Sequence, residues 1–424
     1  MKGNTFHPVE IEVVGCYLVF RVWAANQFSR GPLLKNSQTV RLVGTCPMAI
    51  VYTRAVVQER ERHMKRTFST KISAILLGLA AALLPAGMAN AAESTMPDTF
   101  KEVINPAVAG KYTYTENGAY TKALGIPTYE WMPTNPPLKA IVIGIHGLTL
   151  HGRRYRVLAR ALAVNGIGFV AMDMRGFGSS LFEDKFSTPD NDRKKVSHEK
   201  SYEEIVQLTK LIKEKYPDTR LIALGESLGC TFCVKLAAEH PDLLTGIVLA
   251  APAVKVNKDM YGGEGQIRQG IKAVIRPSHE LNMSSFFADL CSQRADVQQE
   301  MLIDPYIVKK LPLGALISTD EFVDKTAKWG KTTDPSLAVL LLQGSADGCV
   351  SPKHITDLMN NMKSDDQTLA WRGNFGHLQL ETVYMQPAVI DAIANWMVDH
   401  SKDRQAKLKD LQQNIADLGG TIVK

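Results

Sequence analysis

Residues 221–230 read Leu-Ile-Ala-Leu-Gly-Glu-Ser-Leu-Gly-Cys, and the rest of the chain is organised around them. An apolar run with strand character meets a Gly-x-Ser-x-Gly turn, and a helical segment follows to residue 239. This order is typical of a nucleophile elbow, which predicts Ser227 as a nucleophile on a strained turn. Gly225 and Gly229 suit the turn because strand and helix approach closely only where side chains are missing. Such turns also occur without chemistry, so the context decides.

Two further residues follow predicted strands in the order that a serine triad on this kind of sheet requires, first an acid and then a histidine. Asp347 comes after the apolar run 337–342, and His377 lies in the loop Gly-Asn-Phe-Gly-His-Leu at residues 373–378. Asp-Gly also favours a plain turn, and a lone loop histidine is more often structural. Order and position together favour Asp347 as the acid and His377 as the base.

The predicted chemistry is acyl transfer. His377 takes the proton of Ser227, Asp347 orients the imidazole, and the serine forms an acyl-enzyme that water resolves. The oxyanion needs backbone donors, and we expect the N–H groups of Leu228 and Leu148 to supply them.

Apolar strand-like runs alternate with helical segments over most of residues 97–252 and again over 336–400, which predicts a mostly parallel, doubly wound α/β sheet. The alternation stops in residues 253–335, where large apolar side chains occur in helix-like pieces. We interpret this segment as a cap inserted over the carboxyl edge of the sheet. Residues 401–424 carry apolar residues at helical spacing and predict a C-terminal helical tail.

The N-terminal region has a different character. Residues 64–91 combine a basic start, an apolar centre at 72–84 and a small-x-small end, which is typical of a signal peptide cleaved after Ala91. We hypothesise that Met64 is the true start and that residues 1–63 are a doubtful extension. The alternative is a genuine cytoplasmic extension with a short anchor. The sequence thus predicts an exported protein, periplasmic or secreted.

Charge excludes a nucleic-acid partner. The whole chain has a formal charge of +6, but residues 1–91 hold 11 of the 49 Lys and Arg and 4 of the 43 Asp and Glu. The predicted mature chain therefore has 38 basic and 39 acidic residues and a formal charge of −1.

Four cysteines lie in the predicted mature chain. An oxidising compartment leaves room for one disulfide, and our candidate is Cys291 with Cys349. Cys230 and Cys233 have redox-motif spacing, but their place behind Ser227 favours thiols packed against the sheet.

From about residue 112 to residue 400 the chain resembles the α/β-hydrolase superfamily, and within it the monoacylglycerol lipase, lysophospholipase and serine aminopeptidase group. The resemblance implies the triad and oxyanion assignments already reached. Phe177 stands where this group often has His, and Cys230 where a second Gly is common. The matching motifs are His146-Gly147-x-x-x-His151-x-x-Arg154-Tyr155, Asp173-x-Arg175-Gly176-x-Gly178-x-Ser180, Gly225-Glu-Ser227-Leu-Gly229 and Gly376-His377.

The leading hypothesis is an exported serine hydrolase that cleaves carboxylic esters of acyl chains, such as monoacylglycerols or lysophospholipids. The cap would form the chain-binding wall, and its apolar surface leaves open a transient contact with lipid. A serine aminopeptidase is the alternative, since acidic residues in the cap could hold an α-ammonium group. A non-catalytic protein on this fold should have lost a triad member, and none is missing. We expect no cofactor and no metal. Four acidic residues of the cap leave the aminopeptidase alternative open: Glu280, Asp289, Asp296 and Glu300.

Overall fold

The computed structural model describes residues 10–14, 17–21, 108–135, 137–255, 277–284 and 290–400, together with Lys409, Gln412, Gln413 and Ile415. The chain divides into two compact units, Met1–Ser94 and Thr95–Lys424. In the first unit, β1 (Glu10–Val14) and β2 (Tyr17–Arg21) pair antiparallel. The predicted signal peptide and most of the predicted tail lie outside the described residues. Among those residues, no helix has the length and apolar character that crossing a membrane requires.

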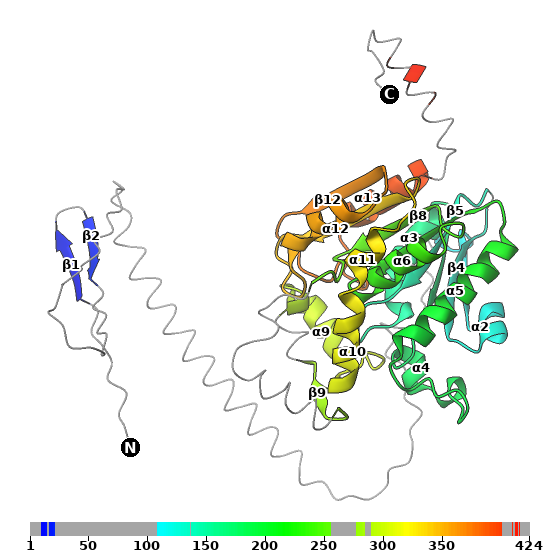
Figure 1. The fold of residues 1–424 in the computed structure, drawn as a ribbon, viewed down its shortest axis with the longest axis horizontal. Coiled ribbons are helices and arrows are strands. Elements are labelled where there is room, and N and C mark those ends of the chain that lie inside the picture. Colours follow the sequence, from blue (N-terminus) through cyan, green and yellow to red (C-terminus); the bar gives the residue numbers. More distant parts are fainter. Residues whose placement is uncertain are drawn as a thin grey trace, which may run out of the picture. The chain divides into compact units, whose positions relative to one another are not determined.

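The second unit contains an eight-stranded sheet (Figure 1). Its order is β12-β11-β8-β7-β5-β6-β4-β3, and all neighbouring pairs from β12 to β6 are parallel. The mostly parallel, doubly wound sheet is therefore confirmed. The strands are β3 (Tyr112–Glu116), β4 (Thr128–Pro133), β5 (Ala140–Ile145), β6 (Ile167–Met172), β7 (Arg220–Glu226), β8 (Gly246–Ala250), β11 (Ala338–Gly344) and β12 (Asp366–Arg372).

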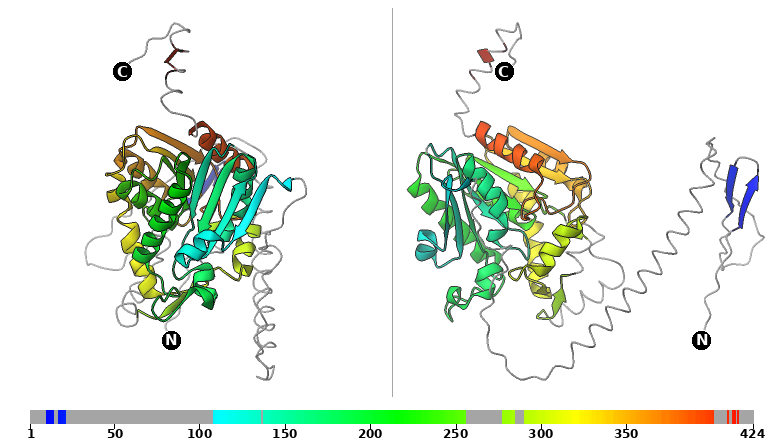
Figure 2. Two further views of the ribbon diagram at one scale, coloured as in Figure 1. Left: turned by 90° about the vertical axis from the view of Figure 1, so that its right-hand side faces the viewer. Right: turned by 180° about the vertical axis from the view of Figure 1, so that it is seen from behind.

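Helices cover both faces of this sheet because its central strands are apolar on both sides (Figure 2). Alternate residues of β5 show the pattern: Val142 packs in the cluster that includes α3 and α13, and Ile143 packs in the cluster that includes α5, α6 and α12. The main helices are α3 (Arg156–Val164), α5 (His198–Lys215), α6 (Leu228–Glu239), α12 (Ile355–Asn361) and α13 (Pro387–His400).

The strand register brings several strand ends together. Ile145 of β5 is paired with Gly225 of β7, and Gly344 of β11 is paired with Arg372 of β12. The loops that follow these strands therefore emerge at one edge of the sheet, where ligand sites of open α/β sheets lie.

The first two strands of the sheet are connected differently from our expectation. Two short β-type runs separated by the turn residues Asn117-Gly118 predict an antiparallel pair at the edge of the sheet. The pair is present, but α2 (Ala119–Leu124) connects β3 to β4, and Asn117 has a positive φ of 54° before it. Another short helix, α4 (Gly178–Phe182), begins inside the motif Asp173-x-Arg175-Gly176-x-Gly178-x-Ser180.

The predicted cap, residues 253–335, is described in part. Its helices α9 (Ala295–Ile303), α10 (Leu313–Val323) and α11 (Thr326–Gly330) agree with the helix-like pattern. The pattern did not predict the antiparallel pair of β9 (Glu280–Asn282) and β10 (Lys310–Pro312). Met301 and Phe322 belong to the same buried cluster as Ile205 of α5, so the cap shares a core with the sheet domain.

Candidate active site

The turn between β7 and α6 places Ser227 at a strained backbone position. Its φ is 54° and its ψ is −117°, a combination that few residues other than glycine adopt. A side chain on Gly225 would collide with the backbone of Gly229, and one on Gly229 would collide with the carbonyl oxygen of Ile145. Both glycines are therefore required by close backbone approach.

The predicted acid and base are in direct contact. Nδ1 of His377 lies 2.9 Å from Oδ2 of Asp347, and both side chains are buried. The other oxygen of Asp347 accepts the N–H groups of Cys349 and Val350 at 2.9 and 3.0 Å, and Gln343 donates to Oδ2 at 3.0 Å. These contacts fix the carboxylate, and the carboxylate in turn orients the imidazole.

Electrostatics favour the charged form of both partners. Burial would lower the pKa of His377, but the adjacent carboxylate of Asp347 outweighs it and raises that pKa to about 9. Burial alone would raise the pKa of Asp347, since it disfavours a carboxylate. The imidazole and the hydrogen bonds to the carboxylate outweigh burial and hold this pKa below its usual range. An imidazolium formed at His377 is thus stabilised where it lies.

Ser227 and His377 line the same cavity, which has a volume of about 80 Å³. Its walls come from both the sheet domain and the cap, and Leu150, Met301 and Val323 make part of them apolar. Leu148 and Leu228, the predicted oxyanion donors, also line it. Leu228 is the first residue of α6, so its N–H has no acceptor within the helix.

Glu226 has a structural function whose hydrogen-bond partners the sequence did not reveal. Its buried carboxylate accepts the backbone N–H groups of Gln379, Leu380 and Glu381 at 2.6, 3.0 and 2.9 Å. The residue before Ser227 thus holds the loop that follows His377. The available signal was one charged residue within an otherwise apolar strand end.

Glu381 extends this connection to a third loop. Its Oε1 accepts the N–H of Gly147 at 2.7 Å, next to Leu148. Burial, followed by the nearby Glu226 carboxylate, raises the pKa of Glu381 well above its ordinary value. The two glutamates therefore join the Ser227 turn, the His377 loop and the Leu148 loop.

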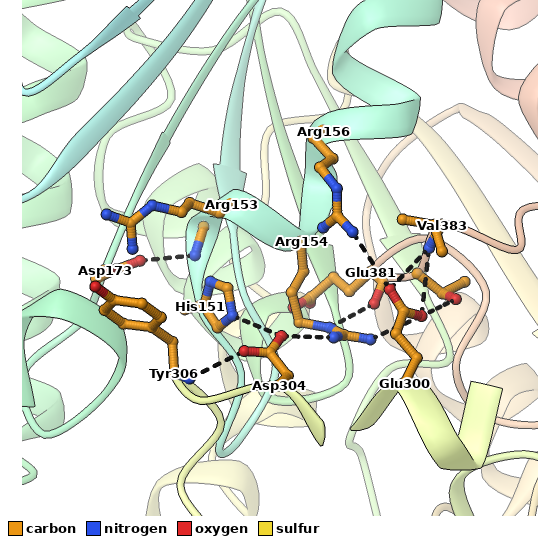
Figure 3. A network of polar contacts seen from close by, with 12 residues as sticks. His151, Arg153, Arg154, Arg156, Asp173, Glu300, Asp304, Tyr306, Glu381 and Val383 are labelled. Carbon is orange, nitrogen blue, oxygen red and sulfur yellow. Dashed lines mark hydrogen bonds and ion pairs between the residues drawn. The ribbon is translucent and has the colours of Figure 1, made fainter. Parts of the chain in front are cut away.

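A buried ionic network attaches the cap to these loops (Figure 3). Arg154 contacts Asp304 at 2.8 Å and Glu300 at 3.3 Å, and its Nε donates to the carbonyl oxygen of Glu381 at 2.7 Å. Nε2 of His151 lies 3.0 Å from Asp304, and Arg156 lies 3.6 Å from Glu300. The motif residues His151 and Arg154 therefore hold the cap in place.

The remaining motif residues make structural contacts. Burial lowers the pKa of His146 to about 4, and its neutral ring accepts the N–H of Met174 at 3.0 Å. Asp173 accepts the N–H of Gly152 at 2.7 Å, and Arg175 pairs with Glu204. Neither Phe177 nor Cys230, the two departures from the group, is among the described residues that line the cavity.

One set of potential metal ligands occurs among the described residues. Asp347, Cys349 and His377 each offer an atom within 4.8 Å of the others. Because Asp347 and His377 are hydrogen-bonded to each other, the geometry is that of an acid–base pair, and we assign it no metal.

Comparisons with known proteins identify the family of the chain. The family model Hydrolase_4, described as serine aminopeptidase, S33, matches residues 136–381, more than half of the chain. Monoglyceride lipase of Homo sapiens is 27% identical over 275 residues, which cover 63% of this chain and 84% of the human protein. Monoglyceride lipase of Mus musculus is 25% identical over 273 residues, with the same coverage of 63% and 84%.

Solved structures show the same fold. The crystal structure of Paleococcus ferrophilus monoacylglycerol lipase has a TM-score of 0.52 and 23% identity, and the match covers 65% of this chain and 99% of that one. A soluble variant of monoglyceride lipase from Saccharomyces cerevisiae, in complex with a substrate analog, has a TM-score of 0.55 and 17% identity, with 70% and 96% covered. The chain belongs to the Hydrolase_4 family (serine aminopeptidase, S33) and is an α/β-hydrolase of the lipase and esterase type.

Proposed function

We propose that the chain hydrolyses carboxylic esters of acyl chains, of the monoacylglycerol or lysophospholipid type, with Ser227, His377 and Asp347 as its triad. The observation that carries this proposal is the 2.9 Å contact between His377 and Asp347 at a cavity that Ser227 also lines.

The proposed reaction has two halves. His377 accepts the proton of Ser227 while the serine oxygen attacks the acyl carbonyl, and Asp347 stabilises the imidazolium. The imidazolium then protonates the leaving alcohol, which gives an acyl-enzyme. Water, activated by the same imidazole, releases the fatty acid and restores the serine.

The backbone N–H groups of Leu228 and Leu148 are the proposed oxyanion donors. Two features support them: the position of Leu228 at the start of α6, and the anchoring of Gly147 by Glu381 at 2.7 Å. Loss of one such donor typically costs on the order of 100-fold or more in rate.

The cavity favours an ester with an apolar acyl group over a peptide. An aminopeptidase needs a carboxylate to hold the substrate α-ammonium group. Glu226 is the one carboxylate among the described residues that line the cavity, and it already accepts three N–H groups. The relatives are named for monoglyceride cleavage.

The positions of the acidic cap residues also favour an ester over a peptide as the substrate. Asp296 pairs with Arg294 at 2.6 Å, and Glu300 is held by Arg154. Glu280 is exposed on β9, and Asp289 lies outside the described residues. The described members of this set are thus occupied by other groups or directed to solvent.

Labelling and turnover test this function together. The purified protein and its Ser227→Ala variant are treated with a fluorophosphonate probe, then offered p-nitrophenyl esters of increasing chain length beside aminoacyl anilides. We expect labelling of the parent protein alone and turnover of the esters. Equal labelling of both proteins would contradict the nucleophile assignment, and turnover of anilides without esters would establish the peptidase alternative.

Export is a second part of the proposal and rests on the pattern of residues 64–91. We propose that the mature protein begins after Ala91, that it acts in the periplasm or outside the cell, and that its cap contacts lipid transiently. Mass spectrometry of the native protein tests the start, since peptides from residues 1–63 would contradict it. Binding to phospholipid vesicles tests the lipid contact.

A further inference from the structure

Two buried cysteines meet where the cap contacts the sheet domain. Cys291 belongs to the cap, and Cys349 lies two residues beyond Asp347; each is 3% exposed. Their Sγ atoms are 3.5 Å apart, although the residues are separated by 58 positions in sequence. A disulfide requires a sulfur–sulfur distance of about 2.05 Å, so the two atoms need to approach by roughly 1.5 Å.

The backbone around both cysteines is already fixed. The carbonyl oxygen of Cys291 accepts the N–H of Leu378 at 2.9 Å, next to His377. The N–H of Cys349 donates to Asp347 at 2.9 Å. The two thiols therefore lie close together. The main chain of Cys291 is hydrogen-bonded to the segment that carries the proposed base, and that of Cys349 to the proposed acid.

We propose that Cys291 and Cys349 form a disulfide that joins the cap to the loop after β11 when the protein folds in an oxidising environment. Each thiol loses its hydrogen, and the two electrons and two protons pass to a disulfide oxidant such as glutathione disulfide, which becomes two thiols. The site is a covalent crosslink that no catalytic step of the proposed hydrolysis uses.

The other described cysteine pair provides a contrast. Sγ of Cys230 lies 3.2 Å from the carbonyl oxygens of Gly225 and Ala250, and Cys230 and Cys233 are both fully buried in α6. Cys230 is thus engaged with the backbone behind Ser227. The pair Cys230 and Cys233 stays reduced under the conditions that join Cys291 to Cys349.

Burial determines when the bridge forms. Only the thiolate attacks a disulfide, and burial raises the pKa of the Cys349 thiol well above its ordinary value. The closed, folded protein is therefore slow to oxidise, and the bridge forms during folding. Closing a loop of this length restricts the unfolded chain and raises the midpoint of thermal unfolding by about 5 °C.

The test is to refold the full chain in a glutathione redox buffer, alkylate the remaining thiols and map the peptides by mass spectrometry without reduction. We expect a linked peptide pair that contains Cys291 and Cys349. We also expect dithiothreitol to lower the unfolding midpoint by about 5 °C. Both readouts are independent of hydrolysis, so they stand if the proposed function fails.

Variants separate the crosslink from general stability. Cys291→Ser and Cys349→Ser should each abolish the shift that dithiothreitol causes, whereas Cys233→Ser should keep it. Finding both cysteines alkylated in the refolded protein would overturn the proposal, as would a bridge from either one to another cysteine. If a variant does not fold, the peptide map of the parent protein still decides.

Discussion

The carboxylate of Glu226 accepts the backbone N–H of Gln379 at 2.6 Å, which ties the residue before the proposed nucleophile to the loop after the proposed base. Two more N–H groups of that loop donate to the same carboxylate. An amide would present hydrogens to some of these donors. The position of His377 relative to Ser227 should therefore depend on both oxygens of Glu226 acting as hydrogen-bond acceptors.

We expect Glu226→Gln to lower kcat by about 10- to 100-fold, because small displacements of catalytic groups cost rates of this order. Since Glu226 also contributes to the raised pKa of His377, the pH at which activity rises should fall as well. Steady-state kinetics across a pH series measure both effects. Glu199→Gln on the exposed face of α5 is the control. An unchanged kcat in Glu226→Gln would show that the contacts of Glu226 do not position His377.

Glu381 should tolerate one substitution and not another. Burial raises its pKa and so favours the protonated form, which glutamine resembles, and glutamine also retains an oxygen for the N–H of Gly147. We expect Glu381→Gln to change kcat by less than about threefold and Glu381→Ala to reduce it by about 10-fold or more. Equal activity of the two variants in an ester assay would show that the Gly147 contact has no effect on catalysis.

The pH dependence follows from the pKa of His377. The base must be neutral to accept a proton, and Asp347 raises that pKa from its ordinary value to about 9. Activity should therefore be lost as pH falls, with kcat/KM rising through an inflection near pH 9. Asp347→Asn should move the inflection down and lower kcat by about 10⁴-fold. A wild-type inflection near the ordinary histidine value would contradict the raised pKa.

Gly229→Ala should destabilise the protein in spite of its position in a helix. Alanine favours helices over glycine by about 1 kcal/mol. The added methyl group, however, would overlap the carbonyl oxygen of Ile145. Neither atom can move aside without a shift of the main chain, because the methyl group is attached directly to Cα and the oxygen belongs to the backbone. We expect a net loss of about 3 kcal/mol in the free energy of unfolding, measured by urea denaturation. Gly373→Ala, where the space is open, is the matched control and should be nearly neutral.

The buried network of the cap predicts a contrast between two aspartates. Asp304→Asn removes the negative charge that buried Arg154 and His151 both contact, and should lower the free energy of unfolding by about 3–5 kcal/mol. Asp296→Asn breaks an exposed, solvent-screened pair with Arg294 and should leave the free energy of unfolding nearly unchanged. Similar midpoints for the two variants in urea would show that the network does not hold the cap.

Much of the sheet could be predicted because its buried strands are continuous apolar runs. The observed bounds of β5 and β8 coincide with the runs 140–145 and 246–250. Short elements carried no such signal: α2 has six residues, and β9 and β10 have three each, too few for a hydrophobic period to show. Their conformation depends on neighbours that are distant in sequence.

The same contrast between local patterns and distant contacts explains which parts of the site could be predicted. Asp347 and His377 could be proposed because each follows a predicted strand, and a parallel sheet gathers such loops at one edge. The partners of Glu226 are backbone N–H groups more than 150 residues away, and Arg154 meets Asp304 across 150 residues. No local pattern marks contacts of this kind.

The two glutamates that join the active-site loops also have a consequence for inhibitor design. Because Glu226 and Glu381 make the Ser227, His377 and Leu148 loops one unit, the reacting groups should present nearly the same geometry to every acylating compound. Compounds that differ only in the part facing the cap would then be discriminated by how tightly they fit its apolar wall. Selective inhibitors should therefore be sought by varying that end while the reactive warhead is kept constant.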